Sequence, residues 1–178
     1  THTYPIWEPK KDNYIYPENL YSPTVISSGL NINAQAKIDL FRYNDQNYQD
    51  LFIFKAGPEL TLGNFKDKFL DYTKVSVYKK LTLTNGNSPF GFDQSVDNKT
   101  IEFNIKQQIF GPITLECNTE YNLDSESPNY NKFFNTKFDL SWNRRAYSIG
   151  ILYNNDTKSG GINFKINSFN FDGYGDSF

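Results

Sequence analysis

Side chains that could perform nucleophilic or acid–base catalysis are scarce in this chain. The only histidine is His2, near the N-terminus, and the only cysteine, Cys117, falls on the apolar side of an alternating segment. No serine lies in a motif typical of an activated nucleophile. One cysteine and one histidine also exclude zinc sites built from several such ligands. We therefore expect no catalytic residue, no metal, no cofactor and no enzymatic activity.

The remaining candidates for chemistry are carboxylates that alternate with apolar residues. Two of them could in principle act as the acid and base of a glycosidase. Lysines share the same polar faces, however, and this favours cross-strand ion pairs in a hydrated interior. The carboxylates are Glu102, Glu116, Glu120 and Asp139, and the lysines are Lys106, Lys137 and Lys165.

The elements that position these side chains are strands, because apolar and polar residues alternate with a period of two. The pattern is cleanest over residues 113–123, where no helix would separate the two classes so well. About eight such segments are recognisable. Their apolar positions span residues 32–40, 52–62, 75–83, 101–109, 113–123, 134–142, 147–153 and 162–166.

The alternation is interrupted in places. Residues 1–30 contain several prolines among tyrosines and polar residues, which predicts an irregular arm or loop. Pro58 lies inside the second segment and predicts a bulge or an early end. After Asn167 the apolar parity changes, as one inserted bulge residue would cause. We therefore expect two parts, an arm over residues 1–30 and an antiparallel transmembrane barrel segment with a C-terminal closing strand over residues 31–178.

Composition limits the class of protein further. The chain has 178 residues and 17% aromatic residues, enough for a core or a lipid-facing belt. Its mean hydropathy of -0.64 is compatible with a barrel, since only alternate positions must be apolar. A net charge of -2 with scattered lysines and arginines argues against binding to nucleic acid. The absence of methionine, even at position 1, favours a fragment of a larger protein.

Long and short connections alternate along the chain. Residues 111–112 and 143–144 form tight turns, whereas residues 84–99 and 124–131 form long loops. Bacterial outer-membrane barrels have short turns on the periplasmic side and longer loops outside. Residues 63–72 are the exception, because a short turn is expected there. The pattern predicts an all-β, antiparallel up-and-down barrel portion of about eight strands in the cell outer membrane.

Several short stretches resemble a known family. They are Ser-Pro-Phe-Gly-Phe-Asp at residues 88–93, Lys-Gln-Gln-Ile-Phe-Gly-Pro at 106–112, Asn-Arg-Arg-Ala-Tyr-Ser at 143–148, and Gly-Gly-Ile-Asn-Phe at 160–164 leading to Phe-Asn-Phe at 169–171. Together they resemble the cyanobacterial branch of the lipopolysaccharide-assembly outer-membrane protein family, also called the OstA or LptD family. The resemblance spans roughly residues 30–178 and is most specific over the last ninety.

The resemblance implies a large barrel that receives lipopolysaccharide from a periplasmic bridge and releases it into the outer leaflet, without making a chemical bond. It implies lipopolysaccharide, membrane lipid, the barrel-insertion machinery, periplasmic bridge proteins and a lipoprotein plug as partners. The polar parity would then line the passage, with Glu102, Lys106, Glu116, Glu120, Lys137 and Lys165 as lumen candidates. The closing strand also resembles the signal read by the insertion machinery, carried by Ser159, Gly161, Phe164, Ile166 and the C-terminal Phe178.

Two other functions fit the alternation itself. A soluble sandwich or small barrel would pack the apolar parity inside and bind carbohydrate or a protein through loop aromatics such as Tyr130 and Phe90. A diffusion porin would share the membrane fold and differ in cargo. The soluble alternative and the membrane barrel differ in the face of the sheet that meets water. In the soluble alternative the apolar parity is packed inside, whereas in a membrane barrel it faces lipid.

Overall fold

The computed structural model describes residues 1–9, 21–22, 26–43, 47–65, 69–90 and 95–167. Within these residues no helix is long and apolar enough to cross a membrane. The strands are β1 (His2–Trp7), β2 (Gly29–Arg42), β3 (Tyr48–Leu62), β4 (Thr73–Gly86), β5 (Lys99–Phe110), β6 (Ile113–Asn122), β7 (Phe133–Asn143), β8 (Tyr147–Asn154) and β9 (Ser159–Ile166).

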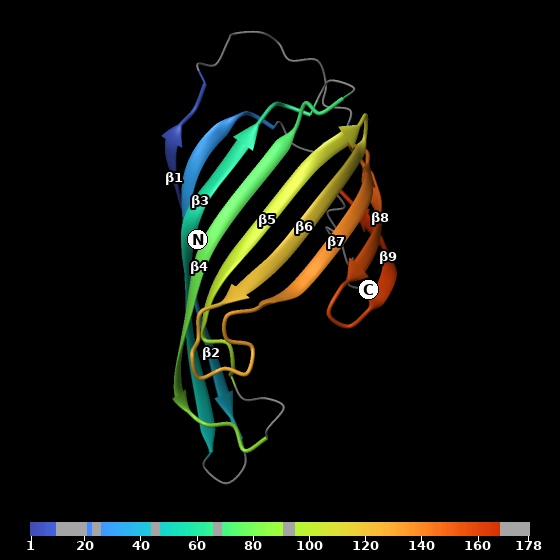
Figure 1. Ribbon diagram of the computed structural model, residues 1–178. Helices are drawn as coiled ribbons and strands as arrows, with labels where there is room; N and C mark the ends of the chain where they lie inside the picture. Colours follow the sequence, from blue (N-terminus) through green and yellow to red (C-terminus); the bar gives the residue numbers. More distant parts are fainter. Residues whose placement is uncertain (10–20, 23–25, 44–46, 66–68, 91–94, 168–178) are drawn as a thin grey trace, which may run out of the picture.

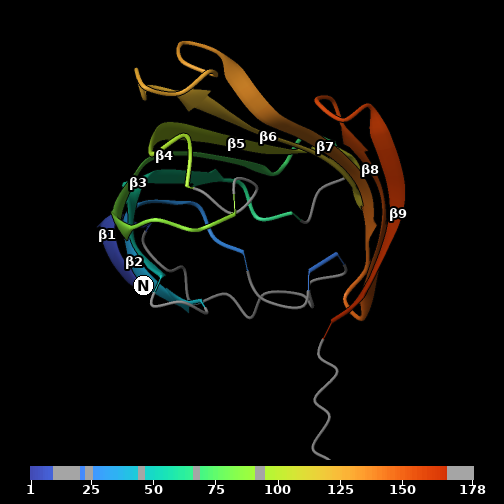
Figure 2. The same ribbon diagram turned by 90° about the horizontal axis from the view of Figure 1, so that it is seen from below.

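All nine strands belong to one antiparallel sheet in which each strand pairs with its neighbour in sequence. Figure 1 shows the strands side by side in chain order, and Figure 2 shows that the sheet follows an arc from β1 to β9. In the described part of the chain the two end strands do not pair with each other, so the sheet is open. The predicted all-β, antiparallel up-and-down architecture is confirmed, with nine strands rather than eight.

The additional strand, β1, corrects the prediction of an irregular arm over residues 1–30. His2 pairs with Ala34 and Trp7 with Leu30, with a register shift between Pro5 and Trp7. The prolines suggested poor pairing, but β1 is an edge strand, and an edge tolerates a residue that cannot donate a ladder hydrogen bond. The prediction was therefore wrong for residues 2–7 and 29–30.

The bulge or early end predicted at Pro58 is also wrong. Pro58 pairs with Ile32 of β2, and β3 continues to Leu62. Pairing with β4 is omitted at residues 57 and 58 but resumes at Glu59 in the same register. Proline lacks an N–H group, so the local ladder is interrupted, yet no residue is inserted and the faces of β3 do not change.

The two faces of the sheet differ in a way that inverts the usual pattern of a soluble domain. Apolar side chains of the alternating segments are widely exposed, and Ile162 reaches 83% exposure. In the described residues, the largest fully buried side chains are instead polar. They are Gln49, Thr100, Gln108, Thr114 and Asn122. The apolar parity therefore forms the outer, convex face, and the polar parity lines the inner, concave face.

A bulge in β7 exchanges the expected faces of two phenylalanines. Asn135 has a positive φ of 52°, and the β6–β7 register shifts between Asn118 and Glu120. Phe134 consequently pairs with Glu120 on the concave side, while Phe133 becomes an outward residue. Phe134 had been assigned to the apolar face on strict alternation. Two further predictions lie outside the described residues. One is the parity change after Asn167, and the other concerns the C-terminal Phe178.

Candidate functional site

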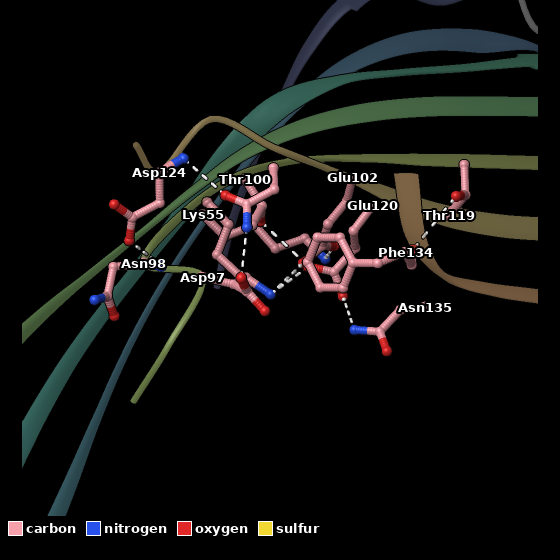
Figure 3. Close-up of polar contacts among 12 residues, drawn as sticks. Lys55, Asp97, Asn98, Thr100, Glu102, Thr119, Glu120, Asp124, Phe134 and Asn135 are labelled. Atoms are coloured by element: carbon pink, nitrogen blue, oxygen red, sulfur yellow. Dashed lines mark hydrogen bonds and ion pairs between the residues drawn. The ribbon is translucent and has the colours of Figure 1, made fainter. Parts of the chain in front are cut away.

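A network of ion pairs crosses the concave face of β3, β4, β5 and β6. The Nζ atom of Lys80 lies 2.7 Å from Oε2 of Glu120 and 3.5 Å from Oε1 of Glu102. Lys55 pairs with Glu102, and Thr100 donates a hydrogen bond to Glu120. Figure 3 shows Lys55, Thr100, Glu102 and Glu120 gathered close together beside the strands. Each carboxylate is thus paired with a lysine from another strand, and the Lys55–Glu102 and Lys80–Glu120 pairs each reach across one intervening strand.

A second set of ion pairs continues along the same face. Lys74 lies 3.0 Å from Glu59, and Lys106 lies 3.1 Å from Glu116. The Tyr78 hydroxyl donates to Glu59 at 2.8 Å. These contacts connect β3 with β4 and β5 with β6, so they extend the network of paired charges along the concave face.

Three adjoining hollows form a continuous polar track along the concave face. The first, about 370 Å³, shares Asn104 and Asn118 with a second of about 270 Å³. It also shares Lys74 and Lys106 with a third of about 580 Å³, which reaches β9. The track is lined mainly by amides, hydroxyls and paired charges.

An aromatic cluster near the start of β4 borders the first and third hollows. The rings of Phe65 and Tyr72 lie 5.3 Å apart, and Tyr21 lies 5.3 Å from Phe65. The Tyr72 carbonyl accepts the backbone N–H of Gln108 at 2.8 Å. Burial, together with the nearby charges of Glu116 and Glu59, raises the pKa of Tyr72 to about 12. Its phenol therefore stays neutral across physiological pH.

Hydrogen bonds also join the two long connections, beside the start of β5 and the end of β6. The buried Asn122 side chain donates to the Ser127 hydroxyl at 3.0 Å and accepts the Asp124 N–H at 2.7 Å. Asp97 accepts from Ser127, and the Asn98 N–H donates to Asp124 at 2.9 Å. These contacts tie the β4–β5 connection to the β6–β7 connection.

The structure places the six lumen candidates from the sequence on the concave face. Glu102, Glu120, Lys106 and Glu116 belong to the ion pairs described above. Lys137 and Lys165 line the second and third hollows and form no ion pair with a described residue.

Sequence reasoning missed the partners on β3 and β4. These are Lys55, Glu59, Lys74 and Lys80. They share the polar parity. The two adjacent lysines at residues 79 and 80 do not themselves indicate which one faces inward. At Pro58 the sequence predicts a bulge or an early end of the strand, which leaves the face of the next residue, Glu59, undetermined. Pairing shows that Lys79 is opposite Ile101 on the outward parity, whereas Lys80 faces inward.

Described residues of the proposed insertion signal lie on the edge strand β9. Ser159 and Gly161 have the concave parity, while Phe164 and Ile166 point outward. Both outward residues are more than half exposed. In the described residues no three His, Cys, Asp or Glu side chains come together in a group that could hold a metal ion.

Replacing Lys80 should destabilise the sheet more than replacing its neighbour Lys79. Lys80→Met leaves Glu102 paired with Lys55 and removes the ion pair of Glu120 with Lys80, which costs about 1–3 kcal/mol. Lys79→Met removes an outward charge without breaking an ion pair of the described residues. The temperature at which the folded protein loses its compact gel mobility measures the difference. Equal temperatures for the two variants would show that the network contributes no stability.

The fold and site define a class of protein, an antiparallel sheet with an apolar outer face and a polar inner track. The family described as "Protein of unknown function (DUF3769)" matches residues 1–170, and the chain belongs to that family. No curated protein matches the chain. No solved structure matches it either.

Proposed function

We propose that the protein is part of an outer-membrane barrel that delivers lipopolysaccharide to the outer leaflet. The observation that carries this proposal is the inverted burial of the sheet, with apolar side chains exposed outside and polar side chains buried inside. A lipid-facing surface accounts for the exposed apolar side chains, and a hydrated passage accounts for the polar side chains on the inner face.

The outward face has the composition that lipid requires. On β6, β7, β8 and β9 none of the outward positions carries a charge. Aromatic residues stand near the strand ends, with Phe133 and Trp142 on β7 and Tyr147 and Tyr153 on β8. The Arg144 guanidinium lies 5.2 Å from the Trp142 ring, a pairing suited to a headgroup region.

The spacing of these aromatics matches the thickness of an outer membrane. Phe133 and Trp142 are separated by roughly 30 Å of strand at ~3.3 Å per residue. At a tilt of about 40°, this separation corresponds to a height of roughly 23 Å, close to the ~25 Å apolar band of such barrels. A soluble sandwich would instead need a second layer over this surface, and the described residues provide none.

The polar track supports a glycan cargo. Asn104, Asn118 and the paired charges offer donors and acceptors to sugar hydroxyls. The resemblance to the lipopolysaccharide-assembly family supplies the identity of that cargo. The same resemblance implies transport without chemical change, and we propose that it is assisted by the insertion machinery, periplasmic bridge proteins and a lipoprotein plug.

Blocking the track tests this function in the full-length protein. Asn118→Trp places a large ring at the point where two hollows meet, so lipopolysaccharide at the cell surface should fall several-fold. Cys117→Trp is the control, because the neighbouring residue faces outward. Surface labelling of lipopolysaccharide, at matched protein levels, gives the comparison.

The result also separates the alternative functions. Loss of small-solute uptake with unchanged surface lipopolysaccharide would favour a diffusion porin and overturn the proposed cargo. Recovery of the full-length protein as a detergent-free soluble monomer would overturn the membrane assignment.

A further inference from the structure

From the third hollow of the track we infer a binding site for an anionic saccharide on the concave face of β7, β8 and β9. The inference rests on the proposed function and adds to it the part of the track that holds the sugar and the charge of that sugar. The hollow has a volume of about 580 Å³, ample for one or two sugar rings. Side chains from three adjacent strands line its wall, namely Asp139, Ser141, Asn143, Ser148, Asn163 and Lys165.

The middle of the hollow is suited to sugar hydroxyl groups. Ser141 donates a hydrogen bond to Asp139, so the carboxylate is held in place with further lone pairs available. Asn163 adds an amide that both donates and accepts. On β8, the residue that lies between Ser141 of β7 and Asn163 of β9 is Gly150, which has no side chain.

Gly150 makes room for this arrangement. A Cβ atom at residue 150 would lie 2.6 Å from Ser141 Oγ and 2.7 Å from Asp139 Oδ1. Glycine therefore lets the two β7 side chains lean over the neighbouring strand. At Gly161 of β9 a Cβ atom would meet nothing within 4 Å, so the surface beside them is open. A sugar ring can approach the backbone closely at such a position.

The third hollow holds a lysine without an ion pair to a described residue, as the second hollow does with Lys137. Lys74 and Lys106, which also border the hollow, are neutralised by Glu59 and Glu116. Lys165 has no ion pair with any described residue and points into the same hollow. Its strand position is opposite Ser148, which pairs with Asn143, so it lies ~13 Å along the strands from Asp139.

The geometry thus provides hydroxyl recognition at Asp139, Ser141 and Asn163, and a cation one or two sugar rings away. A saccharide bearing a carboxylate or phosphate can bind both groups, with its hydroxyls at the polar side chains and its anionic group at Lys165. On β3, β4, β5 and β6 the lysines of the concave face are already paired with glutamates, so that half of the surface offers a neutral lining.

Photocrosslinking in the full-length protein in its own membrane tests this site. Benzoylphenylalanine replaces Asn163 in one variant and Ile162 in another, since these neighbours have opposite parity. Crosslinked species are probed for lipopolysaccharide. We expect capture at position 163 and none at position 162.

Lys165→Gln in the position-163 variant should reduce capture about tenfold, the cost of one charge-assisted hydrogen bond. Lys165→Arg should retain it. Unchanged capture with Lys165→Gln would overturn the inferred recognition of an anion.

A third crosslinker at Asn118 separates failure of the site from failure of the function. Capture at 118 without capture at 163 would overturn the β7–β9 site and leave lipopolysaccharide transport standing. Absence of capture at both positions would overturn both. Compact gel mobility of each variant verifies that it has folded.

Discussion

Ile149→Arg should weaken insertion of the full-length protein into a membrane. Ile149 lies on the outward face of β8, flanked by Trp142 of β7 and Phe164 of β9. Because Ile149 pairs with Trp142, it lies toward one edge of the apolar band, where an outward arginine costs less than the about 2–4 kcal/mol that it costs at the midplane of an outer-membrane barrel. Resistance of the membrane-bound protein to extraction by alkaline carbonate measures insertion. Leu115→Arg on β6 should behave in the same way.

Matched controls come from the concave face. Ser148→Arg introduces the same charge one residue away, where the side chain lines the third hollow. Glu116→Gln removes a charge from the ion pair with Lys106. Both variants should insert. Insertion of all four variants to the same extent would show that the outward face of the sheet does not meet lipid.

The faces on which this prediction depends could largely be predicted from sequence, because period-two alternation is a local property. Leu115 and Glu116 are assigned to opposite sides by counting alone, and their pairing with Leu140 and Asp139 agrees. The same reasoning assigns Lys106, Lys137 and Lys165 to the face that lines the hollows. Alternation does not determine which face is concave, because curvature arises from the whole sheet.

Errors occurred where one residue changes the parity or pairing of a strand. Asn135 adopts a left-handed conformation and moves Phe134 to the concave face. Asparagine tolerates that conformation better than most residues, but its presence in a strand does not predict it. The N-terminal strand was missed because pairing of Tyr4 with Ile32 depends on contacts distant in sequence. Local propensity carries no information about such a partner.

The partners of the candidate lumen residues required the three-dimensional register. Lys80 could be placed near Glu102 and Glu120 only after the alignment of β4, β5 and β6 was known. The hollow at β7, β8 and β9 similarly depends on Gly150, whose role follows from the side chains of the adjacent strand. In each case the decisive contact joins residues far apart in the chain.

Gly57→Ala should strongly destabilise the folded protein, although it adds one methyl group. A Cβ atom at residue 57 would lie 1.9 Å from the Val77 carbonyl oxygen and 2.9 Å from the Tyr78 Cα atom. Both neighbours are backbone atoms of β4, so relief requires moving the strand. Movement would disturb Tyr78, which accepts a hydrogen bond from Asn33 and donates one to Glu59. We expect a loss of about 2–4 kcal/mol in the free energy of unfolding.

Gly161→Ala is the matched control, because its added Cβ atom meets nothing within 4 Å. Both glycines lie inside strands, so the substitution reduces the freedom of the unfolded chain similarly in the two variants. Urea unfolding of the full-length protein in lipid vesicles, followed by tryptophan fluorescence, compares them. Equal midpoints would contradict the close approach of β3 and β4. We expect a lower midpoint for Gly57→Ala alone, because only there does the added methyl group meet backbone atoms of a neighbouring strand.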